Sequence, residues 1–328
     1  MALYIGGTVN FGDNTVASPA EGDIWYDDGK FYFGTSQTFA NVWSSGGNTN
    51  VARSSHAGCG TPLAGLIFGS SLFLTEEYDG SAWATGGDLN TEVSKLAGAG
   101  TQTAGLSMGG ADFLWNDSVV TEEYNGTAWS TGGDMLAGRE LLSGCGTQSA
   151  ALNMGGMANG VQVQDDTEEY NGTSWSTGGD LNLARSAMAA AGTVAAGLCM
   201  GGQNGQMVEE YNGSTWSTAA EVNVHRNYQL AAGTQSAALS AGGGGSGNDY
   251  NTVTELYDGT SWSTDGGDLL NGRSKASGCG SQSSALCAAG RGNYLNGSYG
   301  ALDTSEEYSE GPGTFTGLFY AVKELGGE

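Results

Sequence analysis

Basic residues are scarce in this sequence, which has 10 Lys and Arg against 35 Asp and Glu and a formal net charge of −25. Proteins that bind nucleic acid need dense Lys and Arg to contact phosphates, and anionic membrane surfaces attract basic segments. The composition therefore argues against nucleic acid and anionic membranes as partners. A high charge of one sign keeps a large β-rich protein soluble; a salty habitat or cation binding would also account for it.

Long apolar runs are also missing. No stretch approaches the length of about 18 apolar residues that a membrane-spanning helix needs, so we expect no membrane insertion. The opening residues, Met-Ala-Leu-Tyr-Ile-Gly-Gly, lack the basic and apolar regions of a secretory signal. We therefore expect synthesis in a cytoplasm, and any action outside a cell would require another route, such as release within a particle.

Residues typical of metal sites and catalysis are few. Only two histidines occur, His56 and His225, and the five cysteines form no CxxC spacing. An odd number of cysteines argues against a disulfide framework. Cys59 occupies a repeat position where Ala99 stands elsewhere, which indicates a small core residue. We predict no metal, no cofactor and no catalytic residue, and we keep a carbohydrate-active enzyme built on widely spaced acids as an alternative.

Proline is rare, at 3 residues, whereas glycine reaches 59 and recurs periodically. The phrase Tyr-Asn-Gly-Thr-Ala-Trp-Ser-Thr-Gly-Gly, at 124–133, returns along the chain, with steps of 46, 46, 41, 46 and 51 residues between its tyrosines. A period of roughly 40–50 residues made of short strands is typical of a β-propeller. The repeated aromatic residues are Tyr78, Tyr124, Tyr170, Tyr211, Tyr257 and Tyr308, and Trp43, Trp83, Trp129, Trp175, Trp216 and Trp262.

Each repeat predicts four short strands, here called A to D in chain order. In one repeat, strand A lies near 96–100 and is rich in Gly and Ala, strand B covers 104–108, strand C covers 119–124, and strand D carries Trp129. Asn125-Gly126 predicts a two-residue type I′ turn between strands C and D, since Asn-Gly tolerates positive φ at both positions. The small residues of strand A suit the crowded axis of a propeller, and the Tyr and Trp suit packing between blades.

The order of strands also predicts how the array closes. The last Tyr strand, 305–308, has no Trp strand after it, and the first Trp strand, around Trp43, has no Tyr strand before it. We therefore predict an all-β, six-bladed propeller of four-stranded antiparallel blades, closed by an N-terminal strand, which removes open edges. In the alternative, residues 313–322 supply the last strand. The predicted domains are an attachment segment at 1–41, the propeller at 42–308 and a tail at 309–328.

The repeat resembles that of kelch-type propellers over about 42–308. The resemblance rests on Gly-Gly after strand B, the Tyr of strand C, the Trp of strand D and an Arg before strand A, with Val93 and Lys95 departing from the Arg position. It implies a propeller fold. The Gly-Gly pairs are 109–110, 155–156, 201–202 and 242–243, and the arginines are Arg53, Arg139, Arg185, Arg226 and Arg273.

Two further likenesses bear on function. The wording Thr-Glu-Glu-Tyr-Asn-Gly-Thr-x-Trp is similar to repeat proteins of marine viruses and bacteria, and segment 21–34 is similar to short strand modules of bacteriophage tail and appendage proteins. These likenesses imply a virion protein, such as a tail fibre or appendage. The implied partners are other virion proteins, sister subunits in a homo-oligomer and a host-cell surface.

The loops point to where such a protein would bind. In an antiparallel blade, the B–C and D–A loops share one face, and here the B–C loops vary widely while the A–B and C–D turns are nearly uniform. Diversity on one face of a uniform scaffold is typical of a binding surface. Aromatic rings beside amide and carboxylate side chains are suited to binding sugars. The candidate ligand-binding residues are Phe113, Trp115, Asn116, Asp117, His225, Asn227, Tyr250, Arg291, Tyr294 and Tyr299.

The repeated arginines should form an axial basic ring on this same face. They either pair with the acids of the repeats or create an anion site at the mouth of the channel. Adjacent residues of a strand face opposite sides, so one Glu of each Glu-Glu pair in strand C is available to such an arginine.

We therefore predict a non-enzymatic virion structural protein that binds host glycan or receptor through its loop face, and keep an architectural decoration or connector protein as an alternative.

Overall fold

The structure is a computed structural model, and it describes residues 24–27, 30–33, 37–39, 41–70, 72–203, 205–244, 250–264, 266–293, 299–311 and 313–315. Within these ranges every regular element is a β-strand, so the all-β prediction is confirmed. Residues 41–310 form one compact unit, and residues 1–40 together with 311–328 form another. The larger unit begins one residue before the expected propeller and ends two residues after it.

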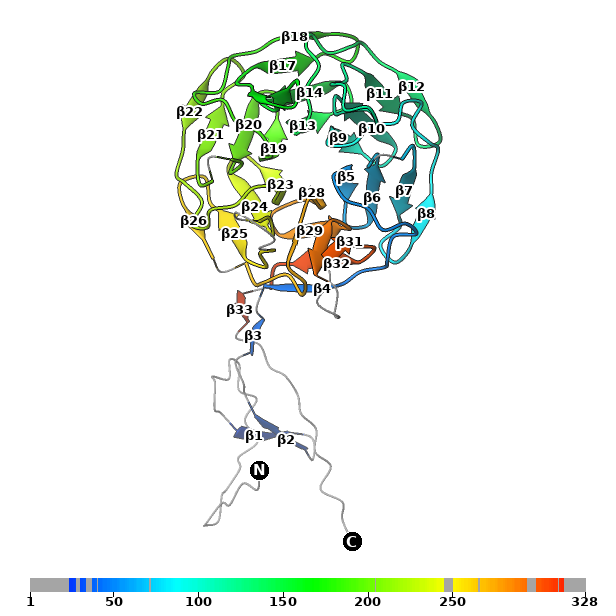
Figure 1. Ribbon diagram of the computed structural model, residues 1–328. Coiled ribbons are helices and arrows are strands. Elements are labelled where there is room, and N and C mark those ends of the chain that lie inside the picture. Colours follow the sequence, from blue (N-terminus) through cyan, green and yellow to red (C-terminus); the bar gives the residue numbers. More distant parts are fainter. Residues whose placement is uncertain are drawn as a thin grey trace. The chain divides into compact units, whose positions relative to one another are not determined.

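Six four-stranded antiparallel sheets, here called sheets I to VI, lie around a central axis in the larger unit (Figure 1). Their innermost strands, β5, β9, β13, β19, β23 and β28, contact one another in that order, and β28 returns to β5. From the axis outward, sheet I contains β5 (Ala57–Thr61), β6 (Ala64–Phe68), β7 (Thr75–Tyr78) and β8 (Trp83–Thr85), and sheet II contains β9 (Ala97–Thr101), β10 (Ala104–Met108), β11 (Thr121–Tyr124) and β12 (Trp129–Thr131).

The next three sheets follow the same order. Sheet III contains β13 (Ser143–Thr147), β14 (Ala150–Met154), β17 (Thr167–Tyr170) and β18 (Trp175–Thr177). Sheet IV contains β19 (Ala189–Thr193), β20 (Ala196–Met200), β21 (Val208–Tyr211) and β22 (Trp216–Thr218). Sheet V contains β23 (Leu230–Thr234), β24 (Ala237–Ala241), β25 (Thr254–Tyr257) and β26 (Trp262–Ser263).

Sheet VI combines strands from both ends of the repeat array. It contains β28 (Ser277–Gly280), β29 (Ser284–Ala288), β32 (Ser305–Ser309) and, outermost, β4 (Val42–Ser45). In the β32–β4 register, Tyr308 pairs with Trp43, as the tyrosine and tryptophan do in the other sheets. The alternative outer strand is not supported for the described part of 313–322, because Gly313–Phe315 (β33) pairs with Gln37–Phe39 (β3) instead; residues 316–322 lie outside the described residues.

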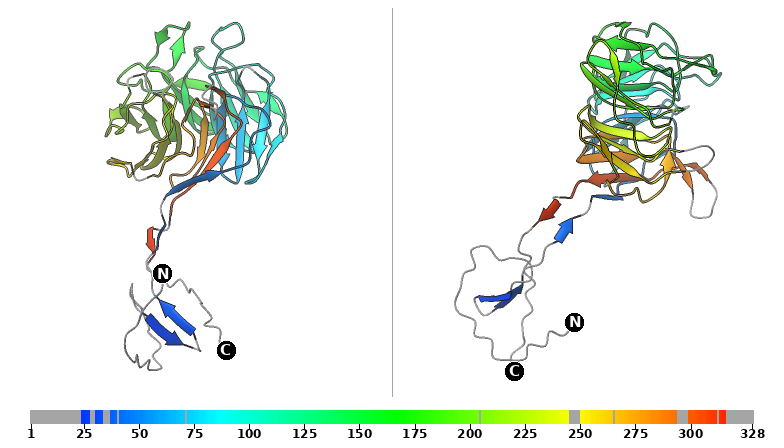
Figure 2. Two further views of the ribbon diagram at one scale, coloured as in Figure 1. Left: turned by 60° about the horizontal axis from the view of Figure 1, so that its bottom comes forward. Right: turned by 90° about the vertical axis from the view of Figure 1, so that its left-hand side faces the viewer.

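Small sheets formed by the loops and by the smaller unit complete the strand set. Two of them extend from one face of the larger unit (Figure 2): the hairpin of β15 (Met157–Ala158) and β16 (Gln162–Val163), and the sheet of β27 (Arg273–Ser274), β30 (Arg291–Asn293) and β31 (Tyr299–Ala301). In the smaller unit, β1 (Ile24–Asp27) pairs with β2 (Lys30–Phe33).

Crowding at the axis explains the small residues of the innermost strands. A Cβ added to Gly98 would lie 2.8 Å from Cζ of Phe68 and 3.1 Å from Cβ of Ala57, both in sheet I. A side chain at this position would push neighbouring sheets apart. The Gly-rich pattern of strand A therefore follows from the close approach of the innermost strands.

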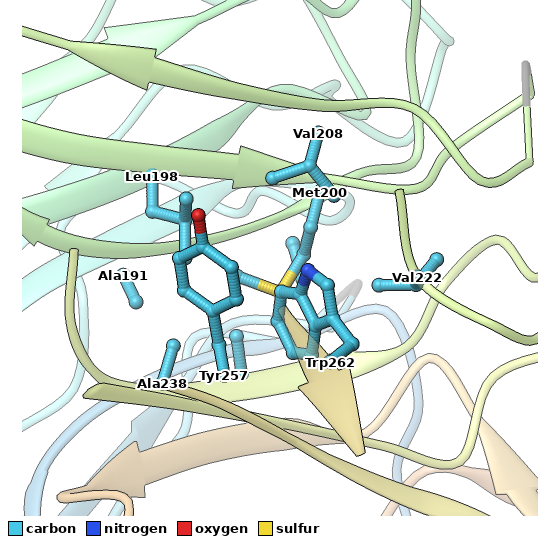
Figure 3. Close-up of a cluster of buried hydrophobic side chains, with 10 residues drawn as sticks. Ala191, Leu198, Met200, Val208, Val222, Ala238, Tyr257 and Trp262 are labelled. Atoms are coloured by element: carbon cyan, nitrogen blue, oxygen red, sulfur yellow. The ribbon is translucent and has the colours of Figure 1, made fainter. Parts of the chain in front are cut away.

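Larger apolar side chains fill the space between sheets farther from the axis. Between sheets IV and V, the rings of Tyr257 and Trp262 lie beside Met200 (Figure 3), and their centroids are 4.8 Å apart. Leu198 and Val208 of sheet IV belong to the same cluster, and both are 0% exposed. Each tyrosine–tryptophan pair of the sequence repeat thus belongs to the core between two sheets.

Hydrogen bonds between neighbouring sheets repeat with the sequence. The Tyr124 hydroxyl donates to Glu77 of the preceding sheet at 2.6 Å, and Nε1 of Trp129 donates to Oγ1 of Thr75 there at 2.9 Å. At the A–B turn, Nε2 of Gln102 donates to the carbonyl oxygens of Gly65 at 3.0 Å and Tyr78 at 2.7 Å. Equivalent bonds recur around the axis, so the repeat specifies contacts between sheets as well as strands within them.

A closed circle of backbone hydrogen bonds lies where the innermost strands begin. The residue two positions before each strand A donates its N–H to the carbonyl of the equivalent residue in the preceding sheet, at 2.8–3.1 Å. All six residues have positive φ, between 54° and 60°. The six, here called the axial circle, are Ser55, Lys95, Leu141, Ala187, Tyr228 and Lys275.

The C–D turns differ from the predicted type I′ geometry. Tyr124 pairs with Trp129, so the connection has four residues rather than two. Gly126 has a φ of +88°, whereas Asn125 is not among the residues with positive φ. Instead, Oδ1 of Asn125 accepts the N–H groups of Thr127 at 3.0 Å and Ala128 at 2.9 Å. The asparagine side chain thus organises the turn, which explains its exchange with Asp79 in another repeat.

Candidate functional site

Three consecutive exposed apolar residues lie in the B–C loop of sheet II, on the loop face. Phe113, Leu114 and Trp115 are 67%, 63% and 69% exposed. Oδ1 of Asp112 accepts the N–H groups of Leu114 and Asn116, both at 2.8 Å, and the Trp115 N–H donates to the Asp112 carbonyl at 3.0 Å. Hydrogen bonds within the loop thus hold these side chains outward, a preorganised arrangement suited to binding.

A cleft of about 400 Å³ lies beside this loop. A carboxylate oxygen of Asp117, on the cleft wall, accepts the N–H of Asn159, in the β15–β16 hairpin of sheet III. The cleft is therefore formed by loops of two neighbouring sheets. Its lining residues are Trp115, Asn116, Asp117, Val119, Gly138, Ala158 and Asn159.

Trp115 also connects this loop to the axial circle. Nζ of Lys95 lies 4.1 Å from the centroid of the Trp115 ring, a cation–π contact. The same Nζ donates to Oε2 of Glu140 at 2.7 Å. One exposed aromatic ring thus borders both the cleft and the axis.

The other predicted loop residues lie elsewhere. The backbone of Asn227 exchanges two hydrogen bonds of 2.9 Å with Gly244, which also bridges to Tyr250. His225 is exposed. Its ring lies against Gly205, because a Cβ built on Gly205 would lie 1.9 Å from Cδ2 of His225. Arg291 and Tyr299 belong to the β30–β31 pair. Tyr294 lies outside the described residues.

The predicted basic ring is not a surface feature. Arg53, Arg139, Arg185, Arg226 and Arg273 are at most 1% exposed. Each forms an ion pair with the first Glu of the strand C pair in its own sheet, as Arg185 does with Glu209 at 3.1 Å. The interpretation of these arginines as partners of the repeated acids therefore holds. The alternative anion site is wrong for them, because burial removes them from any ligand.

The cations that do line the axial opening come from the axial circle. A hollow of about 100 Å³ opens there, and Lys95, Tyr228 and Lys275 line it together with Ser55, His56 and Gln229. In the sequence, Lys95 stands out only as a departure from the Arg position, and neither Tyr228 nor Lys275 is among the predicted site residues. The available signal was their shared place two residues before strand A.

Burial makes the cysteine thiols and the His56 imidazole unreactive. It raises the pKa of the Cys145 and Cys287 thiols to about 12, which keeps them in the unreactive thiol form. Burial, with help from the nearby charge of Arg53, lowers the pKa of His56 to about 3, so its ring is neutral at physiological pH. Among the described residues, no three His, Cys, Asp or Glu side chains gather as a metal site.

The described ranges also contain no helix long and apolar enough to cross a membrane.

Comparisons with known proteins show the fold. No protein-family model matches the chain, and no curated protein matches it. The solved structure of YjhT, which has a β-propeller fold, is similar with a TM-score of 0.64 at 15% sequence identity, over 78% of this chain and 95% of that chain. At this identity the likeness concerns the fold alone. Together with the ring of four-stranded sheets, it places the chain among β-propeller proteins.

Proposed function

We propose that the chain is a kelch-type, six-bladed propeller closed by β4, and that it is a non-enzymatic virion structural protein presenting its loop face to a host-surface glycan or receptor. The difference between the two faces carries this proposal. One face has short turns of nearly constant sequence. The other has loops of different length and composition, with a cleft and exposed rings.

The chemistry of the loop face suits a carbohydrate. Aromatic rings cover the apolar faces of sugars, and amide and carboxylate groups bond their hydroxyls. Trp115 provides such a ring at the cleft, with Asn116 and Asp117 on the same wall. A further aromatic side chain, Tyr250, is partly exposed on this face.

The virion part of the proposal is supported by the two sequence likenesses and by the smaller unit. Segment 21–34, similar to strand modules of phage tail proteins, contains the β1–β2 pair. β3 and β33 join the two ends of the chain outside the larger unit. A unit made of both chain ends suits attachment to other virion proteins or to sister subunits.

A glycan array and a host-cell binding assay on the purified full chain test this function. We expect Trp115→Ala and Tyr250→Ala to abolish or strongly weaken binding without changing the melting temperature, because Trp115 is exposed and Tyr250 is partly exposed. Leu63→Ala is the matched control, since Leu63 is 75% exposed in an A–B turn on the uniform face. Failure of the folded wild type to bind any glycan or host cell would contradict the proposal, as would equal loss in the Leu63 variant.

An architectural role is the second candidate, favoured by the three consecutive apolar side chains Phe113, Leu114 and Trp115. Exposed apolar patches mark protein–protein contacts. If these residues contact another virion protein, particles made with Phe113→Ser should lack the chain or fail to assemble. Normal particles with impaired attachment to host cells would favour the receptor-binding role instead.

A further inference from the structure

The basic residues of the larger unit fall into two groups. Five arginines are buried in ion pairs. The other three in the described part of this unit are Lys95, Lys275 and Arg291. Lys95 and Lys275 belong to the axial circle, and Arg291 pairs in register with Ser274, the neighbour of Lys275. Two of these three cations, Lys95 and Lys275, line the axial hollow, and the third is one strand pair away from it.

Lys275 is a half-buried cation without a carboxylate partner among the described ion pairs. Its Nζ lies 4.7 Å from the centroid of the Tyr228 ring. Burial lowers the pKa of Lys275, and the charges of Arg291 and Lys95 lower it further. Glu140 is the nearby acid, but it bonds Lys95. An anion in the hollow would relieve this concentration of positive charge.

A second polar group in the hollow also lacks a partner. Gln229 is 4% exposed and lines the hollow. Its Nε2 donates to the Met200 carbonyl at 2.8 Å, whereas its Oε1 has no hydrogen-bond partner in the described structure. A buried acceptor without a partner is unfavourable and calls for a donor. Oε1 is itself closed to solvent, so a ligand hydroxyl would provide that donor once the Gln229 side chain turns toward the hollow.

The walls of the hollow complete a site for a sugar acid. Tyr228 lines the hollow, and Trp115 contacts Lys95 from the B–C loop above it. The hollow of about 100 Å³ can admit a carboxylate with the carbon atoms that bear it, but not a folded element. A ligand that combines a carboxylate, hydroxyls and an apolar ring face matches these groups.

We propose that the axial hollow binds the carboxylate of an acidic sugar, with Lys275 contacting the carboxylate and Gln229 accepting a hydroxyl. This inference rests on the proposed function and names the ligand class of the same face. The carboxylate can belong to a free organic acid or to an acidic residue within a host glycan, and the test separates these two sources.

Calorimetric titration of the full chain with three probes tests the site: a galacturonic acid trimer, the neutral galactose trimer and acetate. We expect the acidic trimer alone to bind well, with an affinity that falls as salt is raised. Lys275→Gln should weaken binding by about tenfold or more, the usual contribution of a charge-assisted hydrogen bond. Glu140→Gln is the matched variant with the opposite expected effect. It should strengthen binding of the acidic trimer, because it removes the competing acid beside Lys95.

The outcomes separate this inference from the proposed function. Equal affinity of wild type and Lys275→Gln for the acidic trimer, or equal binding of the neutral trimer, would overturn the acidic-sugar site while leaving receptor binding by the loops intact. Acetate binding as tightly as the trimer would support a carboxylate site for free acids and reject the glycan source. No binding of any acidic probe by the folded wild type would overturn the inference whatever the glycan array shows.

Discussion

The hydroxyl of Tyr308 has no hydrogen-bond partner in the described structure, unlike the other repeat tyrosines. Those five donate to the second Glu of strand C in the preceding sheet, as Tyr170 does to Glu123 at 2.7 Å. In sheet V this position is Leu256, so Tyr308 has no carboxylate to reach. One substitution in sheet V thus leaves a buried hydroxyl unpaired in sheet VI.

Removing the two kinds of hydroxyl should have different consequences. We expect Tyr124→Phe to lower the free energy of unfolding by about 1.5–3 kcal/mol, because a hydrogen bond to a charged group is lost. Tyr308→Phe should be neutral or stabilising, since an unpaired buried hydroxyl is removed. Urea unfolding of both variants measures the difference, and equal losses would contradict it.

The sequence shows Leu256 in place of Glu, yet its effect could not be predicted from the repeat alone. The partner of the second Glu of each strand C pair belongs to the next sheet, as Tyr124 and Glu77 show. Sequence periodicity specifies strands within a repeat rather than contacts between repeats. The arginines are a similar case. Pairing with acids was among the expected roles, but their nearly complete burial became visible only in the structure.

At the scale of elements, the buried arginine links the loop before strand A to strand C. Arg139 donates to the Asp166 carbonyl at 3.0 Å and pairs with Glu168. The carboxylates that pair with the arginines differ in the backbone N–H groups that also donate to them. Glu168 also accepts the N–H of Leu136, whereas Glu255, the partner of Arg226, accepts the N–H groups of both Asn223 and Val224.

Loss of the arginine should therefore lower the free energy of unfolding more in sheet III than in sheet V. We expect Arg139→Val to destabilise the protein by about 3–5 kcal/mol, the usual cost of a buried charge without its partner. Arg226→Val should cost less, because two backbone N–H groups still stabilise Glu255. Sheet II provides a natural precedent, with Val93 in place of Arg and Glu122 held by the N–H groups of Asn90 and Thr91.

Chemical unfolding of the two arginine variants measures this order. Equal losses in both sheets would show that backbone donors do not compensate for the cation.

Strand positions were the part of each element that the sequence predicted well. Strand B at 104–108 coincides with β10, and strand A at 96–100 is displaced by one residue from β9. The turns were predicted less well, because Asn-Gly allows more than one geometry and the side chain of Asn125 selects the four-residue form. The axial circle was not predicted, since residues as different as Leu141 and Lys275 share its backbone conformation.

At the scale of the whole molecule, the β32–β4 pairing makes the first strand of the larger unit essential to its last sheet. Nε1 of Trp43 donates to Oγ1 of Thr254 in sheet V at 2.8 Å. We expect deletion of residues 1–47 to lower the melting temperature sharply, with a loss of at least about 3–5 kcal/mol, the cost of truncating one buried Trp.

Deletion of residues 1–40 is the matched control for this experiment. It removes the N-terminal part of the smaller unit but keeps β4, so the melting temperature of the larger unit should change little. If the two deletions melt alike, β4 does not stabilise the ring.

The repeat tyrosines also predict a response of the whole molecule to alkali. Burial, together with the hydrogen bond to Glu77, raises the pKa of Tyr124 to about 12, and burial raises the pKa of Tyr170 and Tyr308 to about 12. Unfolded tyrosine ionises near pH 10. The stability from these groups is therefore complete below about pH 10 and is lost as the pH rises through about 12.

Tyrosinate absorbance followed against pH, with a parallel probe of β-structure, tests this expectation. Ionisation of the buried tyrosines should coincide with unfolding. Their titration near pH 10 in a folded chain would contradict the burial of these hydroxyls.

The β32–β4 pairing has a further consequence for how the protein is made. Ser44 pairs with Glu307, and these residues are 263 positions apart in the chain. At a translation rate of about 5–20 residues per second, the ribosome needs roughly 13–50 s to travel between them. During that interval Trp43 has no Tyr308 to pack against. The nascent chain must therefore keep an aromatic strand soluble until its partner is synthesised, and the high negative charge along the repeats suits that task.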